Sequence, residues 1–226
     1  MKSFRKENIP LRERKPAQIK LNLLKATLER MKDNSFAEIA VKDLCAQVQV
    51  SEPTFFKYFP RKTDLLIYFF ELWSIEVAAR ALKAEGSSSG LTAIEEIFDF
   101  TARKFDNNPR LMLEVISLLA AARTPFEFPP LSRAERIIAF PGLPQALEID
   151  PQPLEEIFEA YVARAVEHGE LPASIDKEFL VTVLVSYFVG VPLTRKKNAP
   201  QALRFIYRRL LKLLWRSVYA EESPVV

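Results

Sequence analysis

The chain of 226 residues carries a formal net charge of +3, and 49% of its residues are hydrophobic. This hydrophobic content excludes an intrinsically disordered protein, and the length suffices for a core in one domain or in two small ones. Only five glycines occur, and the long apolar segments repeat with helical rather than alternating periodicity, which predicts an all-α fold.

Positive charge is concentrated at the N-terminus. Residues 1–66 hold 14 Lys and Arg against 8 Asp and Glu, a net charge of +6, whereas residues 67–226 hold 18 against 21, a net charge of −3. Residues 1–15 are predicted to be a flexible basic arm. Much of the excess comes from Lys2, Arg5, Lys6, Arg12, Arg14, Lys15 and Lys20.

The first predicted helix covers residues 16–32. Its apolar residues recur every three or four positions and therefore share one face of the helix. These residues are Leu21, Leu24, Leu28 and Met31. A polar Asp-Asn-Ser turn then ends the helix.

Two further helices follow, joined by a short turn. The first has one buried face, made by Val41, Leu44, Cys45 and Val48 at helical spacing. Gln49 and Val50 make the turn, and Ser51 is an N-cap for a helix over residues 52–58 that tolerates Pro53 in its first turn. This helix leaves Thr54, Lys57 and Tyr58 facing outward. Two helices joined by so short a turn form the unit that sets its second helix in the major groove of DNA.

Residues 36–66 resemble the N-terminal domain of the TetR family of bacterial transcriptional repressors. The family pattern is present as Asp43-Leu44-Cys45-Ala46, then Val50-Ser51, then the aromatic run from Thr54 to Phe59, and finally Lys62 to Leu66. A lone helix-turn-helix pattern has little specificity, whereas this extended pattern is specific. The remainder of the chain resembles the family only in length and helical character.

The resemblance implies that residues 52–58 are the recognition helix. It further implies that Pro53 and Phe55 make apolar contacts to bases or sugars, and that Tyr58 and Lys62 hold phosphates. The DNA-binding residues that we predict are Lys42, Ser51, Glu52, Pro53, Thr54, Phe55, Lys57, Tyr58 and Lys62. Beside such a motif the basic arm is either a solvated tail or a further contact to phosphates or a minor groove.

Three residues depart from the family pattern. Gln49 replaces the usual turn glycine, at a steric cost if its φ is positive. Phe56 replaces a common tyrosine and lacks its hydroxyl. Ala40 replaces the usual Ser or Thr that caps the second helix. These departures leave the set of backbone contacts to DNA open.

Residues 67–226 are predicted to form a helical effector-binding and dimerisation domain, after a helix-turn-helix DNA-binding domain of residues 16–66. Further helices are predicted from about residue 62 to the Gly-Ser loop at 86–90, then from 91, 109–122, 132–140, 153–168, 179–191 and 199–219.

Several body aromatics either line an apolar cavity or are ordinary core residues. Helical spacing alone favours core packing for any one of them. The resembled family has an effector pocket in this region, so we predict a site between the helices starting near residues 62 and 153. Its predicted lining is Phe69, Phe70, Trp73, Phe98, Phe105, Met112 and Tyr161. No acid or histidine is clearly inward, which favours an apolar or aromatic effector.

The last two helices are either the core of the monomer or a dimer interface. Residues 179–191 are apolar on nearly all sides, which a surface helix cannot be. Small residues recur there every four positions, and the final helix has an apolar face. The resemblance implies a four-helix homodimer interface that includes Thr182, Ser186, Gly190, Leu203, Ile206 and Leu210. We interpret the opposite, basic stripe of the final helix as a solvated face.

Enzyme chemistry has no support in the sequence. The single histidine, His168, cannot build a metal site or a convincing Ser-His-Asp set, and no Gly-rich phosphate loop occurs. No cofactor is predicted. The lone Cys45 is expected to be a buried structural thiol rather than a redox sensor. The basic N-terminus is not followed by an apolar signal segment, and residues 179–193 are too short to span a bilayer, so a cytoplasmic location without membrane contact is predicted.

The sequence therefore predicts a dimeric transcriptional regulator, by resemblance a repressor, that a small effector releases from a palindromic operator in double-stranded DNA. The alternative is a helical effector-binding or protein-interaction module whose head does not bind specific DNA. Ala40 and Phe56 are the features that favour this alternative.

Overall fold

The computed structural model describes residues 9–85, 89–106, 108–121, 130–194 and 202–220, and these residues form helices without any strand. The predicted all-α fold is confirmed. The chain divides into two compact units. The first unit comprises residues 1–76 and 110–151, and the second comprises residues 77–109 and 152–226. The compact units therefore do not divide at the predicted boundary after residue 66, because the segment 110–151 packs with the N-terminal helices.

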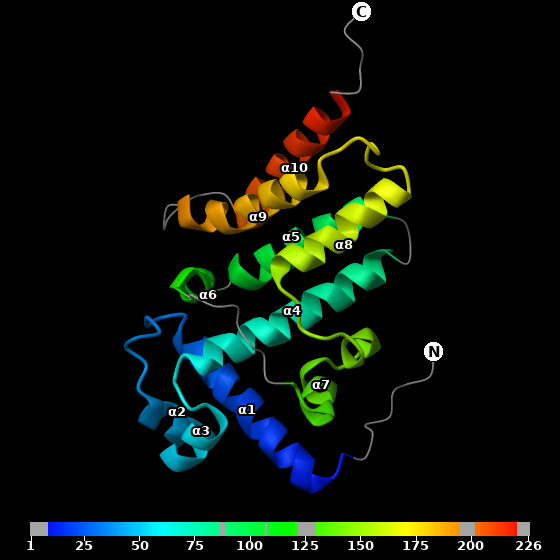
Figure 1. Ribbon diagram of the computed structural model, residues 1–226. Helices are drawn as coiled ribbons and strands as arrows, with labels where there is room; N and C mark the ends of the chain where they lie inside the picture. Colours follow the sequence, from blue (N-terminus) through cyan, green and yellow to red (C-terminus); the bar gives the residue numbers. More distant parts are fainter. Residues whose placement is uncertain (1–8, 86–88, 107, 122–129, 195–201, 221–226) are drawn as a thin grey trace, which may run out of the picture. The chain divides into compact units, whose positions relative to one another are not determined.

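The first unit is built around its N-terminal helices (Figure 1). Its elements are α1 (Leu11–Arg30), α2 (Val41–Val48), α3 (Glu52–Tyr58), the first part of α4 (Asp64–Glu85), nearly all of α6 (Pro109–Ala121), α7 (Arg133–Ala139) and the 3-10 helix η1 (Pro144–Leu147). α1 packs against both α2 and α7. A capping box at Ser132 and Glu135 starts α7 within the predicted 132–140 segment.

α1 begins five residues earlier than predicted. The Pro10 carbonyl accepts hydrogen bonds from the N–H groups of Glu13 (2.9 Å) and Arg14 (3.0 Å), which starts the helix at Leu11. Pro16 then lies inside the helix, where it donates no backbone hydrogen bond. Residues 11–15 are thus helical rather than part of a flexible arm, and residues 1–8 of the predicted arm lie outside the described residues.

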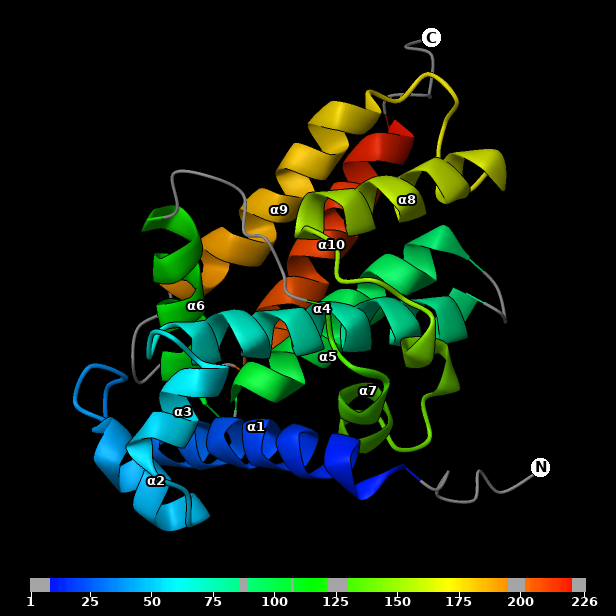
Figure 2. The same ribbon diagram turned by 60° about the horizontal axis from the view of Figure 1, so that its bottom comes forward.

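The second unit packs four helices with the end of α4. They are α5 (Gly90–Asp106), α8 (Leu154–Glu167), α9 (Lys177–Thr194) and α10 (Leu203–Ala220), and Figures 1 and 2 show α9 beside α10 and α5 beside α8. Gly90 lets α5 start directly against α8, because a Cβ there would lie 2.5 Å from the Tyr161 carbonyl oxygen.

An aromatic cluster fills the centre of the second unit. The ring of Phe98 lies 5.5 Å from Phe158, 5.3 Å from Phe188 and 4.9 Å from Tyr207, measured between centroids. The Tyr207 hydroxyl donates to the Phe188 carbonyl at 2.6 Å, so its polar end is satisfied. These contacts join α5, α8, α9 and α10 into one core.

Candidate DNA-binding interface

The turn between α2 and α3 is made by a left-handed residue. Gln49 has φ 59° and ψ 47°, and it is the one non-glycine residue with positive φ among those described. The Val50 N–H donates to the Cys45 carbonyl at 3.0 Å, which closes the end of α2. The expected steric cost of a side chain at this turn is therefore present.

The start of α3 matches the sequence prediction. The Ser51 side chain accepts a hydrogen bond from the Thr54 N–H at 3.3 Å, and its hydroxyl lies 2.9 Å from the Thr54 hydroxyl. Pro53 lies in the first turn. α2, in contrast, has no side-chain hydrogen bond at Ala40, so the expected loss of a cap is also confirmed.

The exposed surface of α3 differs from the prediction at one aromatic position. Glu52, Pro53 and Lys57 are exposed, whereas Thr54 and Tyr58 are half-buried. Phe55 is fully buried, so its predicted contact with bases or sugars is wrong. Phe56 is 45% exposed and is the aromatic side chain that α3 presents to solvent.

Packing explains why Phe55 turns inward. Phe55 and Phe59 are one helical turn apart, with ring centroids at 5.7 Å, and Phe59 lies 5.5 Å from Tyr68 of α4. These tilted ring contacts fix α3 on α4. The spacing of four residues between Phe55 and Phe59 is the sequence signal that places both in the core.

Lys62 has a structural partner instead of a free ammonium. Its Nζ donates to the Phe36 carbonyl and, at 3.1 Å, to the Ala37 carbonyl, and it lies 4.6 Å from the centroid of the Phe36 ring. Burial lowers the pKa of Lys62, against an opposing effect of Glu114. Lys62 also precedes α4, which begins at Asp64. The structure thus binds Lys62 to the turn before α2, and its phosphate contact stays a prediction.

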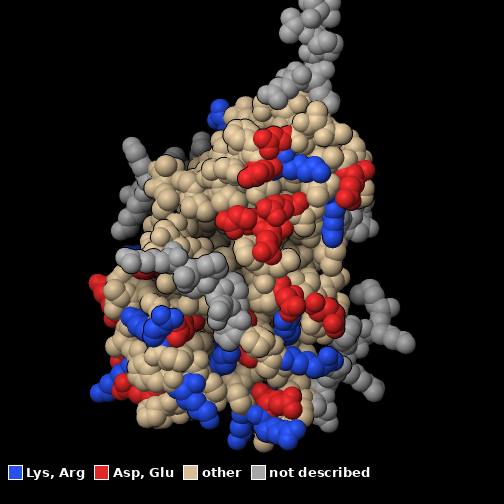
Figure 3. Space-filling view, viewed as in Figure 1, with Lys and Arg blue, Asp and Glu red and all other residues tan. Residues whose placement is uncertain are grey.

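The base of the motif is held by α1. Arg30 donates from Nε to Gln47 at 3.0 Å and lies 3.8 Å from the Asp43 carboxylate. Cys45 is buried beneath α2, and desolvation raises the pKa of its thiol, followed by a smaller effect of Glu52. The prediction of a buried thiol is confirmed. Lys42 is exposed on α2. Figure 3 shows Lys and Arg side chains interspersed with acidic ones over the part of the first unit that holds α1, α2 and α3.

Residues 23–69 match the model of the bacterial regulatory proteins of the tetR family. The chain carries the DNA-binding domain of the TetR family. This match spans the end of α1, then α2, the left-handed turn, α3 and the start of α4, and it confirms the resemblance stated from the sequence. Residues 23–69 are thus a DNA-binding region of the TetR type. No curated protein matches the chain.

Solved TetR-family structures share the fold. FadR from Thermus thermophilus, a transcriptional repressor in complex with lauroyl-CoA, is 18% identical, with a TM-score of 0.62 and coverage of 92% of this chain and 98% of its own. PfmR, a regulator from the same bacterial species, is 18% identical, with a TM-score of 0.55 and coverage of 86% and 97%. CprB from S. coelicolor A3(2) is 18% identical, with a TM-score of 0.56 and coverage of 93% of both chains.

The predicted effector residues are all buried. Phe69, Phe70, Trp73 and Met112 belong to the first unit, and Phe98, Phe105 and Tyr161 belong to the second. Phe98 is part of the aromatic cluster of the second unit, as the core interpretation expects. The expectation that no acid faces inward is wrong, because Glu71, Asp99 and Glu135 are each at most 9% exposed.

The predicted dimer residues divide between two environments. Thr182 and Ser186 are exposed on α9, and a Cβ at Gly190 would meet no atom within 4 Å. Ile206 and Leu210 are half-buried. Leu203 is 2% exposed and therefore belongs to the core, on the same side of α10 as Tyr207, Leu211 and Trp215.

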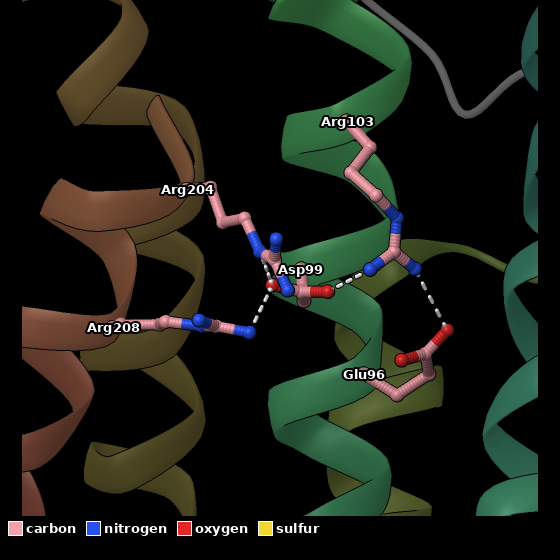
Figure 4. Close-up of polar contacts among 5 residues, drawn as sticks. All are labelled: Glu96, Asp99, Arg103, Arg204 and Arg208. Atoms are coloured by element: carbon pink, nitrogen blue, oxygen red, sulfur yellow. Dashed lines mark hydrogen bonds and ion pairs between the residues drawn. The ribbon is translucent and has the colours of Figure 1, made fainter. Parts of the chain in front are cut away.

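The basic stripe of α10 is partly a structural tie. Figure 4 shows Asp99 of α5 between Arg103 of its own helix and Arg204 and Arg208 of α10. The Arg208 Nη2 lies 2.9 Å from an Asp99 oxygen, and Arg103 also reaches Glu96 at 3.2 Å. Arg204 and Arg208 remain 41% and 61% exposed, as the interpretation of a solvated face expects, but they also pair with Asp99.

Proposed function

We propose that the protein is a homodimeric repressor whose two recognition helices bind half-sites of a palindromic operator, and that a small effector releases it. The observation that supports this proposal most directly is the set of exposed side chains on α3. Glu52, Pro53, Phe56 and Lys57 project from a short helix that Ser51 caps and that Phe55 anchors. Such a helix fits the major groove. A protein that binds DNA in a bacterium acts in the cytoplasm, and we propose this location for the protein.

A DNA titration tests this proposal. The probe is a labelled duplex of the DNA that flanks its own gene, compared with an unrelated duplex of equal length. We expect binding of the flanking duplex at least about 10³-fold tighter than the unrelated one. We expect Lys57→Ala to weaken DNA binding. Lys212→Ala removes an equal charge from an exposed position of α10 and should leave DNA binding unchanged. Equal affinity for both duplexes would instead favour the alternative, a module whose head does not bind specific DNA.

The proposal of a homodimer is supported by an uncovered apolar surface on the second unit. α9 has a mean hydropathy of 1.4 but only 22% of it is buried, and it is the one helix among the described residues that is long and apolar enough to cross a membrane. Phe179 is 66% exposed and Leu193 56% exposed, while on α10 Phe205 and Leu213 are each 53% exposed. We propose that a second copy covers this surface, because the exposed hydroxyls of Thr182 and Ser186 suit a close helix contact better than lipid.

The effector is proposed to bind against α4, the helix that contributes residues to both compact units. A ligand shifts DNA affinity only through a difference in its affinity for two states, so it must contact an element that both functions share. An apolar or aromatic molecule suits Phe69, Phe70 and Trp73. Because FadR was solved with lauroyl-CoA, that acyl thioester is the first molecule to test.

Trp73 supplies the readout for effector binding. It stacks on Phe70 with centroids 5.2 Å apart, and Trp215 is the only other tryptophan. In a Trp215→Phe background, we expect a releasing ligand to change Trp73 fluorescence at the concentration that releases DNA. Release without any change in Trp73 fluorescence, and release that persists in Trp73→Ala, would place the effector site elsewhere.

A further inference from the structure

Ionisable side chains from three helices of the first unit meet in its interior. Lys20 comes from α1, Tyr68 and Glu71 from α4, and Glu135 from α7. Glu71 is 0% exposed and Glu135 is 4% exposed, and the Lys20 side chain is 19% exposed. Figure 2 shows α7 beside α1 at this place. Buried charges are rare in proteins unless they are paired, so the cluster needs an explanation.

One ion pair of the cluster joins α1 to α7. The Lys20 Nζ pairs with the Glu135 carboxylate and lies 4.4 Å from the centroid of the Tyr68 ring. Glu135 also accepts from the Ser132 hydroxyl at 2.7 Å and from the Ser132 N–H at 3.0 Å. Burial alone would raise the pKa of Glu135, but the hydrogen bonds from Lys20 and Ser132 outweigh it and lower the pKa. Glu135 is therefore the ionised partner of Lys20.

Glu71 is the acid of the cluster whose carboxyl group has no hydrogen-bond partner. Both of its carboxyl oxygens are buried without a hydrogen-bond partner among the described residues. Burial raises its pKa to about 8, with Lys20 and Arg136 opposing the rise and Glu135 adding to it. Arg136 is directed elsewhere, since it donates to the Ala146 carbonyl at 3.1 Å, to the Ile149 carbonyl and to Asp150 at 3.3 Å. Glu71 is therefore mostly protonated at neutral pH.

We propose that Lys20 and Glu135 form a latch that holds α1, and with it the α2–α3 pair, against α7, and that the proton on Glu71 keeps this latch closed. While Glu71 is neutral, Lys20 has Glu135 as its one anionic partner in the cluster. An ionised Glu71 attracts Lys20 away from Glu135 and repels the Glu135 carboxylate. The ion pair between Lys20 and Glu135 then breaks, and the latch opens without any substitution in it.

An open latch weakens DNA binding. α1 carries α2 through packing and through the contacts of Arg30 with Gln47 and Asp43. Once α1 is loosened, DNA must reorder it on binding, and the apparent affinity falls by the fraction of molecules in the closed state. One pH unit above the pKa of Glu71, about a tenth of the molecules keep the proton, so binding weakens by up to about tenfold between pH 7 and pH 9.

The DNA arm of the test rests on the proposed function. It measures the affinity for the flanking duplex at pH 7 and pH 9, at constant salt. We expect the affinity of wild type to fall by up to about tenfold from pH 7 to pH 9. The affinity of Glu71→Gln should fall by at most a third of that amount. Glu159→Gln, which removes an exposed carboxyl of α8, should behave as wild type. A wild-type pH dependence that persists in Glu71→Gln would overturn the proposal.

The latch itself is tested without DNA, by thermal unfolding of the full chain at pH 7 and pH 9. Lys20→Met and Glu135→Gln should each lower the midpoint, and the double variant should fall less than the sum of the two shifts. Lys20→Arg should restore the midpoint, while Lys25→Met, an exposed lysine of α1, serves as the control. This coupling should shrink at pH 9 in wild type and not in Glu71→Gln.

The two arms separate the two possible failures. Additive midpoint shifts, or a coupling that does not change with pH, would refute the latch even if DNA binds well. If no flanking duplex binds at pH 7 but the coupling behaves as described, the proposed operator fails while the latch stands.

Discussion

The two compact units treat charge in opposite ways. The first exposes Glu52 and Lys57 on α3 and buries a carboxyl without a hydrogen-bond partner, that of Glu71, in its interior. The second surrounds its buried carboxylate, Asp99, with three guanidinium groups and leaves apolar side chains exposed on α9 and α10. The role of Asp99 is structural, because its ion pairs connect α5 with α10. No contact within the chain accounts for the unpaired Glu71 or for the exposed apolar surface of α9 and α10. Each of these two features therefore indicates a function beyond the folding of the single chain.

The uncovered surface of the second unit gives the largest expected effect. Ser186→Arg places a charge in the middle of the exposed face of α9, where a second copy would bury it at a cost of about 3–5 kcal/mol. We expect light scattering to show a folded monomer that no longer binds the flanking duplex. Glu159→Arg, on exposed α8, should remain dimeric. A dimeric Ser186→Arg chain with normal DNA affinity would show that another surface forms the interface.

The unpaired acid of the first unit gives the next effect. Its pKa is raised to about 8 from 4.5, so the folded state binds the proton more tightly than the unfolded state. Stability is therefore lost as pH rises from about 4.5 to about 8. Glu71→Gln removes this loss and should stabilise the protein by about 3 kcal/mol at pH 7, with little effect near pH 4.5.

Urea unfolding at pH 5, 7 and 8.5 measures this effect. The gain from Glu71→Gln should increase along the series, whereas Glu155→Gln, on the exposed side of α8, should give no trend. A gain that is the same at all three pH values would mean that the Glu71 carboxyl does not titrate in this range.

The compensated acid of the second unit provides the contrast. Asp99→Asn keeps the side-chain volume but leaves Arg103, Arg204 and Arg208 without their shared carboxylate. Because these guanidiniums are partly exposed and can turn to water, we expect a loss of only about 2 kcal/mol. Unlike Glu71→Gln, this change should destabilise the protein at neutral pH. A stabilised Asp99→Asn chain in urea unfolding would remove the contrast between the units.

Sequence patterns predict what lies within one helix better than what lies between helices. The cap at Ser51, the turn at Gln49 and the core position of Cys45 follow from neighbouring residues, and the structure confirms them. The family resemblance misplaces Phe55, whereas its spacing from Phe59 indicates the core position that the structure shows.

The buried ionic contacts have no comparable signal in the sequence. Lys20, Glu71 and Glu135 meet only in the folded chain, because they lie on three helices far apart in sequence. The same holds for Arg204 and Arg208, which periodicity places on a polar face but which reach Asp99 across the helix interface. A Glu within the apolar run LLIYFFELW is the one local sign that a charge is buried.

Substitution of Lys62 gives the smallest expected effect. It tests whether the Lys62 ammonium binds backbone carbonyls of its own chain or a phosphate of DNA. The Lys62→Met variant keeps the side-chain stem over the Phe36 ring but removes the donors to the Phe36 and Ala37 carbonyls. Losing these hydrogen bonds should cost about 1–2 kcal/mol in urea unfolding. Because the ammonium is already occupied, the slope of DNA affinity against salt concentration should not change.

The salt slope decides between the two roles of Lys62. A lysine that neutralises a phosphate contributes close to one unit of the slope of log affinity against log salt, for every DNA sequence alike. A slope reduced by about one in Lys62→Met, together with unchanged stability, would restore the phosphate contact implied by the family resemblance. A lower stability with an unchanged slope would assign Lys62 to the turn before α2, where its ammonium holds two backbone carbonyls and so fixes the position from which α2 begins.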